Sequence, residues 1–182
     1  MLIDAHRSVL LVVDMQEKLL PAIHDHAVVV DHAAWLVRAA QMIDVPVAAT
    51  EQYPKGLGHI VAPLKALLPA AAVAAKNHFS CVAAKCLPQL PGADRAQVVL
   101  AGGEAHVCVL QTALELLEEG KEVYVVADAV GSRRPRDLEI ALTRMRDEGV
   151  RVVTREMVVF EWLGEAGTAL FKDVSKTLLK DG

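Results

Sequence analysis

The sequence predicts an α/β protein built on a mainly parallel sheet of about six strands, doubly wound and covered by helices on both faces. Short apolar runs that suit buried strands alternate along the 182 residues with segments in which apolar residues recur every three or four positions. Hydrophobic residues make up 53% of the chain and charged residues only 23%, which suits a sheet buried on both faces. These observations indicate a three-layer αβα sandwich. Because no linker or repeat interrupts the pattern, we expect one domain over residues 1–182.

Strands are expected where a short apolar and β-branched run lies between turn-forming residues. The first run, residues 8–13, shows no alternation of polar and apolar positions, as in a central parallel strand. The expected strands cover residues 8–13, 47–50, 70–76, 98–101, 123–127 and 150–153.

Helices are expected where apolar residues return on one face. The longest spans about 26–43, with Val29, Ala33, Leu36 and Ala40 on the same side. The segment 51–59 contains two glycines and a proline, so an irregular loop is expected there, at the lip of a pocket. The other expected helices lie near residues 61–68, 109–120, 138–149, 156–163 and 168–179.

Three polar residues stand where predicted strands end. Asp14 and Lys76 follow apolar runs directly, and Cys108 lies where the run 98–101 passes through a Gly-Gly pair into a helix. In a doubly wound sheet the carboxyl ends of the strands border the ligand crevice, so we expect the three side chains to converge there. A carboxylate, an ammonium and a thiol are the parts of an activated thiolate nucleophile. The helix start is expected to lower the pKa of the Cys108 thiol.

Composition excludes several other classes of protein. The net charge is −4 and basic residues are scattered apart from a short cluster at 133–136, which disfavours a nucleic-acid partner. The three cysteines form no C-x-x-C pair and no even set, so a reducing cytoplasm is expected. The first residues lack the apolar core of a secretion signal. No run approaches the ~18 apolar residues that a membrane span needs.

Four segments of the chain resemble motifs of the isochorismatase-like (cysteine hydrolase) superfamily. The loop 50–58 is further similar to the subgroup of isochorismatase domain-containing proteins. The resemblance covers almost the whole chain and implies the strand order 3-2-1-4-5-6. The matching segments are Leu11-Val12-Val13-Asp14-Met15-Gln16, Lys76-Asn77-His78-Phe79-Ser80, Gly103-Glu104-Ala105-His106-Val107-Cys108-Val109 and Asp128-Ala129-Val130-Gly131-Ser132-Arg133.

The resemblance also implies roles for individual residues. Asp14 would be the general base, Lys76 the supporting cation and Cys108 the nucleophile. A cis peptide bond between Gly103 and Glu104 would turn the Glu104 N–H toward the Cys108 N–H, so that both bind an oxyanion. The residues expected to line the substrate pocket are Gln16, Tyr53, Phe79, His106 and Val107.

Two departures from the superfamily narrow the chemistry. Nicotinamidases carry an Asp-x-His motif and a further histidine for a metal, whereas the corresponding region here offers Glu51, Tyr53 and only His59. One imidazole does not make a zinc site, so no metal and no other cofactor is expected. Isochorismatases proper cleave a vinyl ether without a nucleophilic cysteine, and the presence of Cys108 argues against that reaction.

The favoured reading is therefore a hydrolase of a small-molecule amide or related C–N bond, acting through a thioacyl-enzyme. Two alternatives remain open: a non-catalytic binding or assembly protein that keeps the fold, and isochorismatase-type ether hydrolysis. A ribonuclease role is disfavoured by the charge. The resemblance implies a homo-oligomer (dimer, tetramer or larger), and apolar residues between Trp162 and Phe171 are compatible with an interface. Cys81 and Cys86 are read as packing residues, and His106 as either a pocket or a structural histidine.

Overall fold

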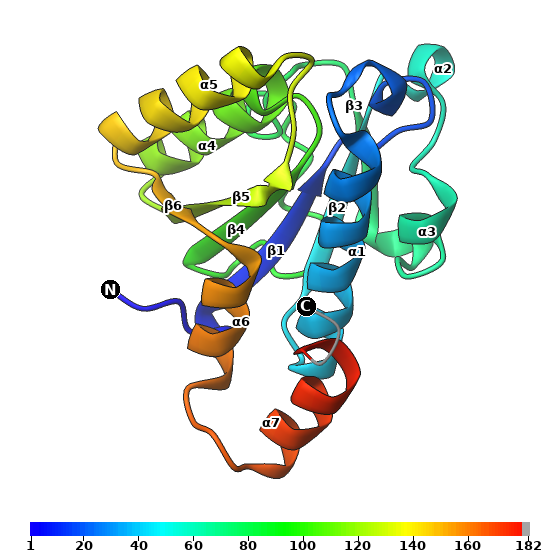
Figure 1. The fold of residues 1–182 in the computed structure, drawn as a ribbon. Coiled ribbons are helices and arrows are strands. Elements are labelled where there is room, and N and C mark those ends of the chain that lie inside the picture. The colour runs from blue at the N-terminus through cyan, green and yellow to red at the C-terminus, as the bar shows by residue number, and fades with distance from the viewer. Residues whose placement is uncertain (180–182) are drawn as a thin grey trace.

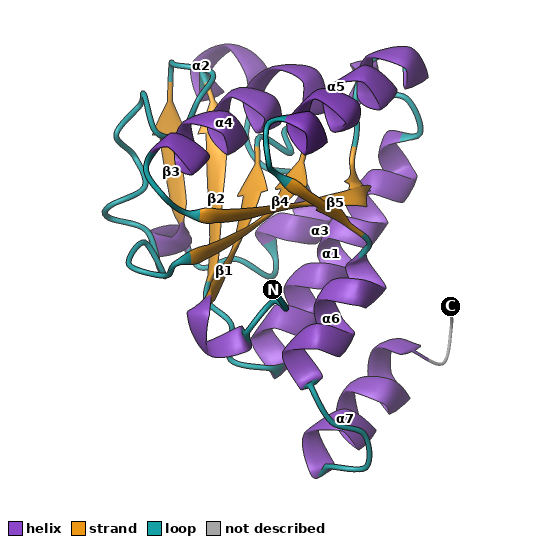
Figure 2. Cartoon of the chain, turned by 90° about the vertical axis from the view of Figure 1, so that its left-hand side faces the viewer, coloured by secondary structure: helices purple, strands orange, loops and turns teal. Residues whose placement is uncertain are grey.

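A parallel six-stranded sheet lies between two layers of helices in the computed structural model, which describes residues 1–179 (Figures 1 and 2). All five strand pairings are parallel, and the order is β3-β2-β1-β4-β5-β6. The predicted fold class and strand order are therefore confirmed. The strands are β1 (Ser8–Val13), β2 (Val47–Gln52), β3 (Val73–Lys76), β4 (Gln97–Gly102), β5 (Glu122–Val130) and β6 (Arg151–Val153).

Helices α1, α3 and α6 lie on one side of the sheet, and α4 and α5 lie on the other (Figures 1 and 2). Each predicted helix is present in part or in full. A four-residue helix, α2, also forms in the predicted irregular loop, where Pro54 occupies the first turn. The helices are α1 (His26–Met42), α2 (Pro54–Leu57), α3 (Ala62–Lys65), α4 (Leu110–Glu118), α5 (Pro135–Asp147), α6 (Arg155–Leu163) and α7 (Ala169–Val174).

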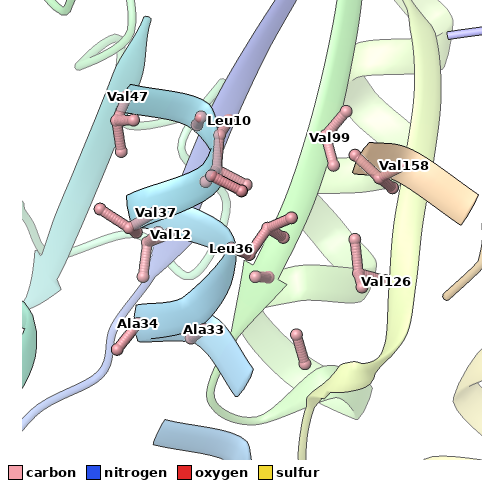
Figure 3. Close-up of a cluster of buried hydrophobic side chains, with 14 of the residues drawn as sticks. Leu10, Val12, Ala33, Ala34, Leu36, Val37, Val47, Val99, Val126 and Val158 are labelled. Atoms are coloured by element: carbon pink, nitrogen blue, oxygen red, sulfur yellow. The ribbon is translucent and has the colours of Figure 1, made fainter. Parts of the chain in front are cut away.

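The core on the α1 side is a layer of aliphatic side chains (Figure 3). Leu36 of α1 is completely buried, and it belongs to the same cluster as Leu10 of β1 and Val99 of β4. The opposite face of β1 packs against a second cluster, on the side of α4 and α5. Because both faces of β1 are covered, all six of its residues are buried, which explains the absence of alternation in its sequence.

The second face of the sheet is covered unevenly. Helices α4 and α5 pack over its β4–β6 half, while the connection from β3 to β4, residues 77–96, contains only turns and bends. Side chains of this connection, including Cys81, Cys86 and Leu90, join the buried cluster beside β1 and β2. The sheet therefore has a loop in place of a helix on this part of its surface.

Within residues 1–179, no helix combines the length and the apolar character that a membrane crossing requires.

Candidate active site

The strand order brings Asp14 and Lys76 into contact although their strands are not neighbours. Asp14 follows β1, and Lys76 ends β3, with β2 between them. The Lys76 Nζ donates to Asp14 Oδ2 at 2.7 Å, and neither side chain is exposed to solvent. The long lysine side chain thus spans the intervening strand.

Lys76 is surrounded by oxygen atoms. Besides Asp14, its ammonium donates to Gln52 Oε1 at 2.7 Å and to the carbonyls of Phe79 at 2.9 Å and His78 at 3.3 Å. Burial by itself lowers the pKa of Lys76, but the negative charge of Asp14, with the nearby thiols, outweighs it and holds the pKa above its ordinary value. Lys76 is therefore a fixed cation and not a group that exchanges protons near neutral pH.

The Asp14 carboxylate is held from the side of β2. The Thr50 hydroxyl donates to Asp14 Oδ1 at 2.8 Å, and the Asp14 N–H donates to the Thr50 carbonyl at 3.1 Å. The backbone of Asp14 is left-handed, with φ of 54°, a conformation that aspartate tolerates better than most residues. One carboxylate oxygen thus faces a cation and the other a hydroxyl donor.

Gln16 and Gln52 form a clamp behind this pair. The Gln16 side-chain amide donates to the carbonyls of Gln52 at 2.9 Å and Gly58 at 2.7 Å, and its oxygen accepts from the Gln52 N–H at 2.6 Å. Gln16 is fully buried, so it supports Gln52 and, through it, Lys76, whereas sequence reasoning placed it in the pocket wall. Sequence reasoning did not single out Thr50 or Gln52. The available signal was the change from three apolar residues, 47–49, to three polar residues, 50–52, within one strand.

Cys108 lies close enough to Asp14 and Lys76 for both charges to act on its thiol, in a π-helical turn, Ala105–Val109, that precedes α4. It is 1% exposed. Burial, followed by the negative charge of Asp14, raises the pKa of the thiol well above its ordinary value, and Lys76 only partly opposes this effect. The expectation that the helix start would lower this pKa is therefore wrong. Desolvation and a neighbouring carboxylate outweigh the partial charge of one helix end.

The turn before Cys108 also differs from expectation. The cis peptide bond predicted between Gly103 and Glu104 is absent, since no peptide bond in residues 1–179 is cis. The chain turns instead through a left-handed Glu104, with φ of 50° and ψ of 61°, after Gly102 at φ of 144°. At Gly102 a Cβ would lie 2.2 Å from the Val13 carbonyl oxygen, so only glycine fits. Two unusual backbone conformations thus make the bend.

Glu104 is fixed by its side chain and leaves its N–H available. Its carboxylate accepts from Arg133 Nε at 2.7 Å and is largely buried. Within residues 1–179 the Glu104 N–H donates no hydrogen bond. Cys108 lies in the first turn of the following helical segment, where N–H groups point away from the helix. A donor pair from these two residues is the arrangement that an oxyanion would need.

The remaining predicted pocket residues lie at the surface around this edge of the sheet. Tyr53 and Phe79 are 54% and 51% exposed; Tyr53 directly follows β2, and Phe79 lies three residues after Lys76, the last residue of β3. His106 and Val107 are half-buried beside Cys108, and His106 Nδ1 lies 3.0 Å from the Ser132 hydroxyl. These residues are more exposed than Asp14, Lys76 and Cys108, as residues at the rim of a pocket would be.

The residues considered for a metal site interact with each other. His59 Nδ1 lies 3.0 Å from Glu51 Oε2, and Glu51 Oε1 accepts from the Ile60 N–H at 2.8 Å. The backbone N–H of Tyr53 donates a hydrogen bond to the Lys76 carbonyl at 2.8 Å. Within residues 1–179, no group of three or more His, Cys, Asp or Glu is arranged to hold a metal ion.

Comparison with known proteins gives consistent matches over most of the chain. The model of the isochorismatase domain matches residues 8–157. Isochorismatase domain-containing protein 2 of Danio rerio is 42% identical over 174 residues, which cover 94% of this chain and 86% of the relative.

Solved structures agree with this match. MAR1 ribonuclease from Caenorhabditis elegans aligns with a TM-score of 0.88 at 36% identity, over 99% of this chain and 93% of that one. YcaC from Pseudomonas aeruginosa, solved with hexane-2,5-diol and covalent acrylamide, aligns with a TM-score of 0.87 at 25% identity and the same coverage of both chains. Escherichia coli YcaC, an octameric hydrolase of unknown specificity, has the same fold, with a TM-score of 0.90 at 24% identity over 99% of this chain and 92% of that one.

Proposed function

This chain belongs to the isochorismatase domain family, a family of hydrolases, and from that premise we propose that it is a cysteine-dependent hydrolase of small-molecule amides or related C–N bonds. The observation that carries the proposal is the completely buried Asp14–Lys76 ion pair beside the Cys108 thiol. Burying two charges costs desolvation energy that a hydrophobic pair of the same size would avoid. Such a pair next to a nucleophile is what general-base activation requires.

In the proposed reaction, Asp14 takes the proton of the Cys108 thiol as the sulfur attacks the carbonyl carbon of the amide. Because the thiol is neutral in the resting protein, attack and proton transfer occur together, and Lys76 offsets the charge that develops on sulfur. The carbonyl π electrons move to oxygen, and the Glu104 and Cys108 N–H groups hold the resulting oxyanion.

The intermediate then collapses and the C–N bond breaks. The leaving nitrogen takes the proton from Asp14, so an amine or ammonia departs and a thioester to Cys108 remains. Water attacks the thioester while Asp14 accepts one of its protons. The second collapse breaks the C–S bond, releases the acid and returns that proton to the sulfur. Each cycle thus consumes one water and restores the neutral thiol.

A relative supports a reactive thiol in this fold. YcaC from Pseudomonas aeruginosa was obtained with covalently bound acrylamide, an electrophile to which a thiol adds once a base has taken its proton. Another relative, the MAR1 ribonuclease from Caenorhabditis elegans, has a name that indicates a different activity, RNA cleavage. In this chain the net charge of −4 and the small, buried charged pair favour a compact neutral amide over a polyanion.

The proposal is tested by incubating the purified protein with a panel of primary amides and measuring ammonia release. We expect release from at least one small amide, and we expect the Cys108→Ala protein to release none above background. The same assay includes a structured RNA and a vinyl ether. RNA cleavage or ether hydrolysis that survives Cys108→Ala, without amide turnover, would contradict the proposal. Tight binding of a panel member without turnover would instead favour a binding or assembly role.

The substrate class, the cellular location and the oligomeric state of the enzyme are also part of what we propose. We expect a small-molecule substrate, a cytoplasmic location and assembly into a homo-oligomer. Trp162 is buried, so its side chain does not contribute exposed apolar surface to an interface around residues 162–171. The large exposed apolar side chains nearby, within residues 1–179, are those of Met157, Phe160 and Leu170, which are 47%, 47% and 39% exposed.

A further inference from the structure

A cavity of about 470 Å³ lies on the α4 side of the sheet and is separate from the candidate active site. Asp14, Lys76 and Cys108 do not line it. Its floor is formed by β1, β2 and β4, and its walls by α4 and the turn segment 81–94. The cavity exists because this segment crosses the sheet as turns and does not pack against it as a helix would.

The lining of the cavity is mainly apolar. Aliphatic side chains of Val9, Leu11, Ala48, Leu90 and Leu116 form most of it. In an open pocket, an apolar ligand that covers such side chains removes their apolar surface from water, which is favourable. The lining thus favours an apolar occupant over water.

Two of the polar side chains that line the cavity, Lys121 and Cys81, have partners within the protein. The Lys121 ammonium donates to the carbonyls of Arg95 at 2.7 Å and Ala93 at 3.1 Å. The Cys81 thiol, at the inner end, lies 3.8 Å from the Thr50 hydroxyl. These contacts leave Lys121 and Cys81 with little hydrogen-bonding capacity for a ligand.

Charges at the edge of the cavity are balanced. The lining residues include two lysines, Lys85 and Lys121, and two acidic residues, Asp94 and Glu119. Two positive and two negative side chains select neither an anion nor a cation, so the preferred ligand is neutral. The volume is about three times that of a cavity known to hold benzene and falls within the usual range of ligand pockets.

We propose that this cavity is a second binding site, for a neutral apolar small molecule of the size of a fused or linked two-ring aromatic compound. The site does not depend on the hydrolase reaction, because none of the catalytic candidates contributes to it. Entry occurs through the turn segment, where Val82 and Leu87 are only partly buried.

The proposal is tested with N-phenyl-1-naphthylamine, a neutral two-part aromatic fluorophore whose emission rises in apolar surroundings. We expect saturable binding to the wild-type protein with one site per chain. In the Leu87→Trp variant the indole occupies the cavity, and binding should weaken at least about tenfold. Leu114→Trp is the matched control, since Leu114 is also partly buried and packs against the same apolar cluster, but it does not line the cavity.

The Cys108→Ala variant shows whether the fluorophore binds at the candidate active site or in the cavity. Unchanged binding to Cys108→Ala, together with loss in Leu87→Trp and retention in Leu114→Trp, places the fluorophore in the cavity. No saturable binding to the wild type, or equal binding to both tryptophan variants, would overturn the proposal. Because the readout is binding alone, failure of the amide assay does not affect it.

Discussion

Replacing Cys108 by alanine is expected to lower turnover of a verified amide substrate by about 10⁴-fold or more, since no other group can form the thioester. The protein should remain folded. Cys108 is buried but small, so its loss is expected to change the free energy of unfolding by about 1 kcal/mol. Single-turnover rates and urea unfolding curves of the wild type and variant measure the two effects separately.

Cys108→Ser tests whether the sulfur atom itself is needed for turnover. It keeps a group of similar shape, but a hydroxyl is a much poorer nucleophile than a thiol in this setting, and its turnover should also be largely lost. Substantial turnover by either variant, with the protein verified as free of wild type, would show that Cys108 does not carry the reaction. Loss of turnover accompanied by unfolding would contradict the prediction that these variants stay folded. It would mean that the Cys108 side chain is needed for the stability of the fold.

Lys76→Met is expected to lower the free energy of unfolding by about 3–5 kcal/mol, because it leaves the buried Asp14 carboxylate without its counter-charge. The change also removes the donor to Gln52 Oε1 and the Phe79 carbonyl. Turnover should fall as well, since the thiolate loses its cation. Urea unfolding at neutral pH measures the stability, and Lys65→Met, on the exposed face of α3, should stay within about 0.5 kcal/mol of wild type.

The double variant Asp14→Asn with Lys76→Met distinguishes two causes of lost stability: an unpaired buried charge and a general disruption of the fold. Removing both charges together should restore part of the stability, because the cost lies in one uncompensated buried charge and not in the absence of the pair. A single variant as stable as wild type would mean that the two groups do not pair in the folded protein. A double variant less stable than the sum of both singles would contradict the electrostatic explanation.

The fold could be predicted from the sequence because its signals are local. A strand buried on both faces, such as residues 8–13, shows an unbroken apolar run, and the covering helices show their period of three to four. The boundaries were less accurate where tertiary contacts extend an element. Strand β5 runs to Val130, three residues beyond the predicted end, because Gly102 of β4 pairs with Val130 after an irregularity in register.

The candidate site could be predicted only in its charged and nucleophilic parts. Asp14 and Lys76 were found because a polar residue that ends an apolar strand is conspicuous. The supporting Thr50 and Gln52 of β2 were missed, because their roles depend on Asp14 and Lys76, which follow β1 and end β3 on either side of β2. The pKa of Cys108 was predicted in the wrong direction for the same reason, since burial and the charge of Asp14 are properties of the folded chain.

The central claim is that Asp14 and Lys76 act on the Cys108 thiol, and alkylation of Cys108 by iodoacetamide as a function of pH tests it most directly without any substrate. Because burial and Asp14 raise the thiol pKa, wild-type Cys108 should react slowly at neutral pH and faster only above the ordinary thiol value of 9.0. In Asp14→Asn the negative charge is gone and Lys76 remains, so the profile should move to lower pH by about one unit or more. Peptide mapping by mass spectrometry follows Cys108 separately from the other two cysteines, and glutathione serves as the free-thiol reference. Rapid labelling of wild-type Cys108 at neutral pH, or identical profiles for wild type and Asp14→Asn, would contradict the account.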